Sequence, residues 1–186
     1  IIVLSSLYNG IIMDIFKSFF LIFFISFTTV SYYSVIGSIF KLSTFSNNQY
    51  KEPDSIYFQI LKGIILISFA ALIIHFFFPL DNFINSLFLI IFFIIAFFKK
   101  KIFLIKKNFF KLVFISLVST LFIVFSNINR PDAALYHLPY VSYLNEHKII
   151  FGLNLIHFRF ATTSIIQYLS AFNYNFLFGL NGISVP

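Results

Sequence analysis

The residues that could do chemistry gather in one stretch, Asn127–Phe160, which holds both arginines, three of the four histidines and two of the six acids. Within it, Asp132 could act as a general base toward a hydroxyl group, because a carboxylate in hydrogen-bond reach can take that proton. Tyr136 follows one helical turn later, and His137 beside it could assist acid–base work or bind a hydroxyl. The alternative for Asp132 is an acid that stabilises a helix dipole from the first turn.

Two arginines suggest a phosphate-binding function for the same stretch. Arg130 and Arg159 are the chain's only arginines, and every other cation is a lysine. A guanidinium binds phosphate through a bidentate fork that an ammonium cannot reproduce. His157 would share a side with Arg159 in an extended segment, so we group it and Tyr136 with the two arginines as candidate binding residues. The alternative for the arginines is snorkelling at a membrane interface.

Metal and cofactor chemistry is not predicted. The chain has no cysteine, and His137, His147 and His157 are spaced too regularly and too far apart to match a zinc motif. Phosphate-loop, dinucleotide and serine-nucleophile motifs are absent from the sequence. The remaining polar residues of the stretch have both a structural and a functional interpretation. Glu146 could belong to a solvated face or be a site residue. Tyr136, Tyr140 and Tyr143 could form an interfacial belt or a platform on which a sugar stacks.

The elements that must position these residues are membrane helices. The chain is 60% hydrophobic and 10% charged, against about 25% charged in an ordinary soluble domain. Four stretches are nearly free of charge and long enough to cross about 30 Å of hydrocarbon: 18–36, 63–80, 83–98 and 109–126. Their apolar runs are continuous rather than alternating, which favours helices over a barrel. We therefore predict an all-α, polytopic integral membrane protein whose transmembrane region is 1–126.

A lysine cluster predicts the orientation of these spans. Six lysines and no acid lie between Lys99 and Lys111, and the positive-inside rule places such a loop in the cytoplasm. The net charge of +7 then reflects topology, so no nucleic-acid partner is predicted. By alternation, the connection 37–62 lies inside, the turn 81–82 lies outside, and 127–160 is an extracytoplasmic loop of a multi-pass protein in the cytoplasmic membrane.

We expect short interfacial helices in the loop 127–160. Asn129 could cap the first, and Pro139 would interrupt it and start a second that ends near Lys148. Residues 161–186 would form a fifth span, cut short by the end of the sequence, or a re-entrant helix lining a lipid-carrier groove. The chain starts without methionine and ends after an apolar run, so we expect it to be part of a larger protein. His75 would hydrogen-bond a neighbouring helix or, alternatively, relay protons.

The motif Asp132-Ala-Ala-Leu-Tyr136-His137-Leu-Pro139, followed by Gly152-Leu-Asn-Leu-Ile-His157-Phe-Arg159-Phe, carries a family resemblance. Over residues 130–186 the chain resembles a family of uncharacterised bacterial polytopic membrane proteins, which is similar to GT-C membrane glycosyltransferases and to polysaccharide polymerases. The resemblance implies Asp132 as catalytic base and a sugar donor carried on polyprenyl phosphate. In GT-C enzymes that aspartate follows the first span, whereas Asp132 follows four, which keeps a polymerase-like relative open.

The resemblance thus implies a glycosyltransferase-like protein of cell-surface glycan assembly. Its partners would be the bilayer, a polyprenyl-phosphate-linked sugar and an acceptor glycan. Two alternatives stay open on the sequence: a polytopic transporter or flippase, and a non-catalytic membrane assembly subunit. A transporter is expected to have helices interrupted by glycine or proline, or charges at the membrane midplane.

Overall fold

The computed structural model describes residues 2–39, 55–125, 137–150, 152, 155 and 164–184. Within these ranges all regular structure is helical, which confirms the predicted all-α class. The elements are α1 (Ile2–Ile39), α2 (Ile56–His75), α3 (Asn82–Phe98), α4 (Phe103–Lys107), α5 (Phe109–Phe125), α6 (Leu138–Glu146), α7 (Ile165–Phe172) and the 3-10 helix η4 (Gly179–Ser184).

Side-chain caps explain where three of the helices begin. The Ser55 hydroxyl accepts a hydrogen bond from the Phe58 backbone N–H at the start of α2, and the Asp81 carboxylate accepts one from Ile84 at 2.7 Å at the start of α3. Ser164 begins α7 with a reciprocal capping box that includes Gln167. Each cap satisfies backbone donors that a helix start leaves without an intrahelical partner.

Two helices are long and apolar enough to cross a membrane. These are the 27-residue segment Met13–Ile39 of α1 and the 20 residues of α2, whereas α3 and α5 are apolar helices of 17 residues. Three of the predicted stretches coincide with these helices: 18–36 lies inside α1, 83–98 differs from α3 by one residue, and 109–126 differs from α5 by one residue.

The predicted span 63–80 is displaced along the chain. The helix α2 covers Ile56–His75, so residues 56–62 are helical and residues 76–80 form a turn that leads to the cap of α3. Ser55 starts the helix early, and Pro79 disfavours a helical conformation at Phe78, which explains the early end. The connection between α1 and α2 is accordingly shorter than the predicted 37–62.

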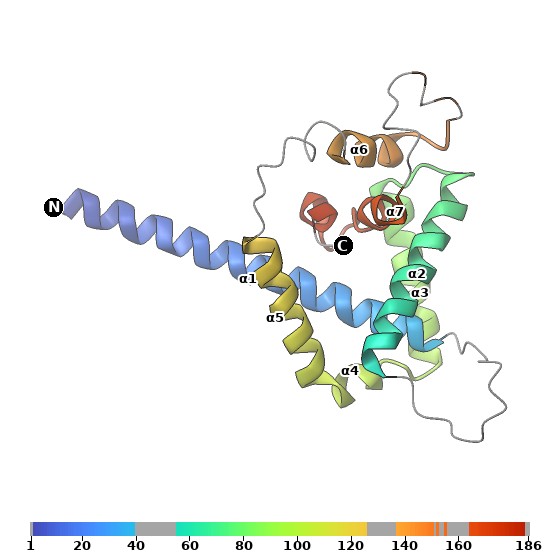
Figure 1. Cartoon of the computed structure of the whole chain (residues 1–186), viewed down its shortest axis with the longest axis horizontal. Helices are drawn as coiled ribbons and strands as arrows, with labels where there is room; N and C mark the ends of the chain where they lie inside the picture. Colours follow the sequence, from blue (N-terminus) through green and yellow to red (C-terminus); the bar gives the residue numbers. More distant parts are fainter. Residues whose placement is uncertain are drawn as a thin grey trace.

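The lysine-rich α4 and the polar helix α6 lie at opposite ends of the helical layer (Figure 1). The helix α2 runs from the α4 end to the α6 end, where α3 begins, and α7 lies beside α6 and packs against α2. The helix α1 crosses this layer and packs on α2 and α5, and its N-terminal part projects away from the other helices. The arrangement places residues 137–150 opposite the lysine hairpin 99–111.

Two glycines bring α1 and α2 into backbone contact. A Cβ atom added at Gly37 would lie 1.8 Å from the Gln59 carbonyl oxygen, and one added at Gly63 would lie 1.9 Å from the Tyr33 carbonyl oxygen. Both distances are far below any real contact, so only glycine fits at these two positions. Small residues at a helix crossing are typical of packing in membranes, where close approach of the backbones provides the attraction.

The exposed face of α5 is apolar, whereas its buried face includes two hydroxyl residues. On α5 the buried positions are Leu112, Ser116 and Thr120, whereas Phe110 and Phe122 are 86% and 74% exposed. The two hydroxyls donate to carbonyls one turn earlier in the same helix, at 2.7 and 2.8 Å. An apolar exterior around a partly polar contact face supports a hydrocarbon environment.

The C-terminal region differs from the predicted fifth span. Instead of one continuous helix, residues 164–184 form α7 with eight residues, a turn, and η4 with six residues. An eight-residue helix is about 12 Å long, which is too short to cross a bilayer. The five residues Tyr168–Phe172 of α7 are all buried, and Gly179, the first residue of η4, adopts a left-handed φ of 54°. This region packs against α2 and α6 as part of the protein core.

The glycine crossing gives a first prediction. Gly63→Ala adds a methyl group against the α1 backbone, and overpacking of this kind costs about 1–3 kcal/mol or more, despite the better helix propensity of alanine. We expect a lower free energy of unfolding in detergent, measured by circular dichroism. Ile65→Phe is the control, because it adds atoms on an outward-facing position of the same helix. Equal stability of Gly63→Ala and the unmodified chain would contradict the close crossing.

Candidate functional site

A chain of hydrogen bonds connects three helices at the α6 end. His75, the last residue of α2, is 1% exposed, and its Nε2 atom lies 2.8 Å from the His147 carbonyl oxygen. Its Nδ1 atom lies 3.3 Å from the hydroxyl of Tyr168 on α7, and the Tyr168 hydroxyl in turn accepts a hydrogen bond from Tyr140 on α6. The expected bond between His75 and a neighbouring helix is therefore confirmed.

The acceptors fix the direction of every proton in this chain. A carbonyl can only accept, so the Nε2 atom of His75 carries a hydrogen and its Nδ1 atom is the acceptor of a neutral ring. Tyr168 must then donate to Nδ1, which leaves its oxygen free to accept from Tyr140. All three side chains are satisfied in a single pattern, and a second proton on His75 would reverse its hydrogen bond with Tyr168, because the Nδ1 atom would then donate.

Burial raises the pKa of both tyrosines of this chain. Desolvation is the largest cause for Tyr140 and for Tyr168, because the neutral phenol tolerates burial and the phenolate does not. The hydrogen bond that Tyr140 donates raises its pKa further, and the same bond lowers that of the accepting Tyr168. Tyr140 is 4% exposed, so it is neither an interfacial belt residue nor a stacking platform, in contrast to the two predicted roles.

Two buried asparagines hold the same helices together through their backbones. The Asn85 amide lies 2.6 Å from the Leu80 carbonyl, 2.9 Å from that of Ala171 and 2.8 Å from that of Tyr174. The Asn145 amide donates to the carbonyls of Leu80 and Ala171 as well. We call Asn85 and Asn145 the amide clamp, since they join α3, α6, α7 and the turn after α2.

Beside the amide clamp lies a polar cleft, with a volume of about 680 Å³. Two carboxylates, those of Asp81 and Glu146, line it together with the Ser142 hydroxyl and the Asn145 amide. The carboxylates are held in place, because Asp81 caps α3 and Glu146 accepts a hydrogen bond from Ser142 at 2.9 Å. The remaining walls are mostly apolar and include Leu138, Leu180 and Ile183. Such a cleft can bind a neutral polyol through carboxylate acceptors and amide and hydroxyl donors.

Of the predicted catalytic and binding residues, the structure describes His137. It is exposed at the start of α6, where its Nδ1 atom accepts from the Gln167 amide at 3.3 Å. The other members lie outside the described residues: Arg130, Asp132, Tyr136, His157 and Arg159. The predicted second interfacial helix is present as α6, but its apolar residues Val141 and Leu144 are buried in the protein core instead of dipping into the bilayer.

The sequence indicates a possible site role for Glu146 and a hydrogen bond for His75, but it does not predict the cleft or the hydrogen-bond chain. Asp81 was assigned to a short outer turn, and Tyr168 and Asn145 were given no role. An acid next to a helix start was a usable signal for Asp81, because two apolar stretches meet there with a single charged residue between them. Tyr168 and Asn145 carry no such signal, because their partners are far away in sequence.

A match to a known family covers residues 15–185, from α1 to the end of η4, and the family is described as a domain of unknown function, DUF8201. The chain belongs to this family. No curated protein and no solved structure matches the chain. The DUF8201 domain therefore includes the lysine hairpin at one end, and at the other the polar cleft and the hydrogen-bond chain of His75.

The hydrogen-bond chain of the DUF8201 domain predicts a strong effect of one hydroxyl. Tyr168→Phe leaves His75 Nδ1 without its donor and Tyr140 without its acceptor, and each buried unsatisfied group costs about 1–3 kcal/mol. We expect a clear loss of stability in a thermal unfolding experiment in detergent. Tyr57→Phe, at a 59% exposed position of α2, removes a hydroxyl with little effect. Similar losses of stability in the two variants would show that the hydrogen-bond chain does not stabilise the protein.

The raised pKa of Tyr140 predicts a pH dependence. A tyrosine ordinarily ionises near pH 10, and the folded state holds this proton more tightly than the unfolded state does. The stabilising contribution is therefore complete below about pH 10 and is lost as the pH rises further. We expect the free energy of unfolding to fall above pH 10, and to fall less steeply in Tyr140→Phe. Identical slopes in both proteins would contradict this assignment.

Proposed function

We propose that the chain crosses the membrane four times, through Met13–Ile39 of α1 and through α2, α3 and α5. Two of these helices have the length and apolar character of spans, and the 17 residues of α3 and α5 cover about 25 Å each. The positive-inside rule then favours a cytoplasmic position for the lysine hairpin and an extracytoplasmic position for α6. The placement of α4 and α6 at opposite ends supports this orientation (Figure 1).

We further propose that the protein acts in cell-surface glycan assembly, as a glycosyltransferase-like enzyme that uses a polyprenyl-phosphate-linked sugar. The observation that carries this proposal is the polar cleft at the α6 end, whose lining includes Leu138, Ser142, Asn145 and Glu146 of α6. The hydroxyl groups of a sugar can donate hydrogen bonds to the carboxylates of Asp81 and Glu146. The apolar walls of the cleft suit the faces of a sugar ring or the start of a lipid tail.

The residue roles in this proposal follow the resemblance of residues 130–186. Asp132 would take the proton of an acceptor hydroxyl, and His137 would assist it from the start of α6. Arg130 and Arg159 would hold the phosphate of the carrier, together with Tyr136 and His157. The exposure of His137 supports its part, since the ring is accessible and is oriented by Gln167. Neither a metal nor a cofactor enters this scheme.

The test is a transfer assay with the intact protein in its native membranes. A labelled sugar on polyprenyl phosphate is the donor, and formation of the glycosidic bond is measured. Removal of a general base typically lowers the rate by about 100-fold or more, so we expect that loss for Asp132→Asn. We expect Glu146→Gln to raise the KM for the acceptor more than it lowers kcat.

Asp14→Asn is the matched control, because it removes an exposed carboxylate on the projecting part of α1, where Asp14 pairs with Lys17. Unchanged transfer by Asp132→Asn would end the proposed role of that residue. Movement of the labelled carrier across the membrane without a new glycosidic bond would replace the enzyme by a transporter or flippase. Normal glycan assembly after removal of all the polar groups named here would indicate an assembly subunit.

A further inference from the structure

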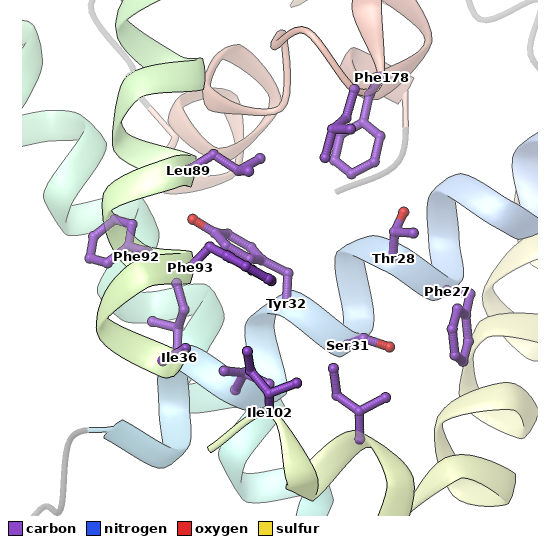
Figure 2. A pocket seen from close by; sticks show the side chains of 14 residues that line it. Phe27, Thr28, Ser31, Tyr32, Ile36, Leu89, Phe92, Phe93, Ile102 and Phe178 are labelled. Atoms are coloured by element: carbon purple, nitrogen blue, oxygen red, sulfur yellow. The ribbon is translucent and has the colours of Figure 1, made fainter. Parts of the chain in front are cut away.

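An apolar cavity of about 250 Å³ lies between α1, α3, the hairpin that contains α4 and the C-terminal turn (Figure 2). Its walls are aliphatic and aromatic, with Leu89 and Phe92 from α3, Ile102 and Ile105 from the hairpin, and Phe178 from the C-terminal turn. An engineered apolar cavity of about 150 Å³ already admits benzene, so this cavity has room for a longer hydrocarbon segment.

A groove adjoins this cavity and leads to the charged hairpin. Phe93 and Ile102 line both the cavity and the groove, and the far wall of the groove includes Lys100. Lys100 has a left-handed φ of 52°, which is unusual for a residue with a side chain and sets the turn at which the groove ends. A ligand with a hydrocarbon tail and an anionic head would match the apolar cavity and the lysine at the end of the groove.

The charge of the hairpin is not compensated within the described part of the chain. Its six lysines are Lys99, Lys100, Lys101, Lys106, Lys107 and Lys111, and no acid lies among them. The ion pair that the described residues form is elsewhere, between Lys17 and Asp14 on α1. A cluster of this kind beside a membrane attracts anionic headgroups, and basic pockets between helices bind them specifically.

Ser31 and Tyr32 line the cavity, but their hydroxyl oxygens do not face it. The oxygens of Ser31 and Tyr32 are buried and make no hydrogen bond within the described residues, and Ser31 is 5% exposed. Both residues line the cavity, and Figure 2 shows the Tyr32 ring extending from α1 toward α3. Because neither oxygen is accessible, the cavity offers a bound ligand an almost purely apolar wall.

We propose that the cavity and the groove bind one anionic phospholipid. Its phosphate pairs with Lys100 and neighbouring lysines, and part of one acyl chain occupies the cavity. The cavity and the groove share no lining residue with the polar cleft, so the site does not depend on the proposed glycosyl-transfer activity. It would hold α1, α3 and the hairpin together, since each of them contributes to the wall.

The chain has no tryptophan, which allows a direct measurement. Phe93→Trp places a single fluorophore at the junction of cavity and groove, and Phe122→Trp places one on the exposed surface of α5. The full chain is reconstituted in nanodiscs that contain phosphatidylglycerol or phosphatidylcholine with brominated acyl chains, at equal mole fractions. We expect the Phe93→Trp signal to be quenched more strongly by the brominated phosphatidylglycerol, and the Phe122→Trp signal to be quenched equally by both.

Lysine variants then test the headgroup contacts. Replacing Lys99, Lys100 and Lys101 by glutamine in the Phe93→Trp chain should lower the apparent affinity for phosphatidylglycerol by about fivefold for each lysine in contact. Lys17→Gln removes one lysine charge from the projecting part of α1, and this control should leave the affinity unchanged. Circular dichroism confirms that each variant is folded.

Three outcomes would overturn the proposal. Equal quenching by the two lipids at Phe93→Trp would mean that bulk lipid alone reaches the cavity. A preference for phosphatidylglycerol that survives the triple lysine replacement would separate the cavity from the hairpin charge. Absence of quenching by either lipid would mean that the cavity is closed or filled by protein. Failure of the transfer assay would leave all three readouts unaffected, so the two proposals are tested separately.

Discussion

The backbone contact between α1 and α2 is the constraint on which the rest of the structure depends. At Gly37 and Gly63 the two helices approach so closely that no side chain fits between them. This crossing brings Tyr33 on α1 within reach of Asn173 after α7, where the Asn173 amide donates to the tyrosine oxygen at 3.0 Å. The C-terminal turn thereby rests on α1, and α7 reaches the end of α2 where His75 lies. The α1–α2 crossing therefore helps to set the positions of the C-terminal turn and of α7.

The environment of the helices explains where polar groups are found. When the outer surface contacts hydrocarbon, a hydroxyl must find its partner inside the protein, and the serines and threonines of α5 use carbonyls of their own helix. At the α6 end, the larger polar side chains form networks between helices. Four buried hydroxyls among the described residues depart from this rule, those of Ser26, Ser31, Tyr32 and Tyr143.

The sequence predicted the features that depend on local pattern. The apolar stretches, the helix after Pro139 and the burial of His75 against a neighbouring helix all follow from hydropathy, proline geometry and the cost of an unpaired polar group. The hydrogen-bond chain and the amide clamp were not predictable, because Tyr168 is 93 residues from His75 and Asn145 is 65 residues from Leu80. The predicted fifth span failed because apolar composition does not distinguish a buried short helix from a crossing one. Most of the candidate site, including Asp132, lies outside the described residues.

The amide clamp has an uneven tolerance to sequence change. Its acceptors at Leu80 and Ala171 are main-chain carbonyls, which any amino acid supplies, so other small or aliphatic residues of fitting size can occupy both positions without losing the bonds. Its donors are the side-chain amides of Asn85 and Asn145, and an aspartate of nearly the same shape would set a carboxylate against two carbonyl oxygens. In related chains, substitutions are therefore tolerated at the positions that supply the acceptor carbonyls, but not at Asn85 and Asn145, which supply the donors.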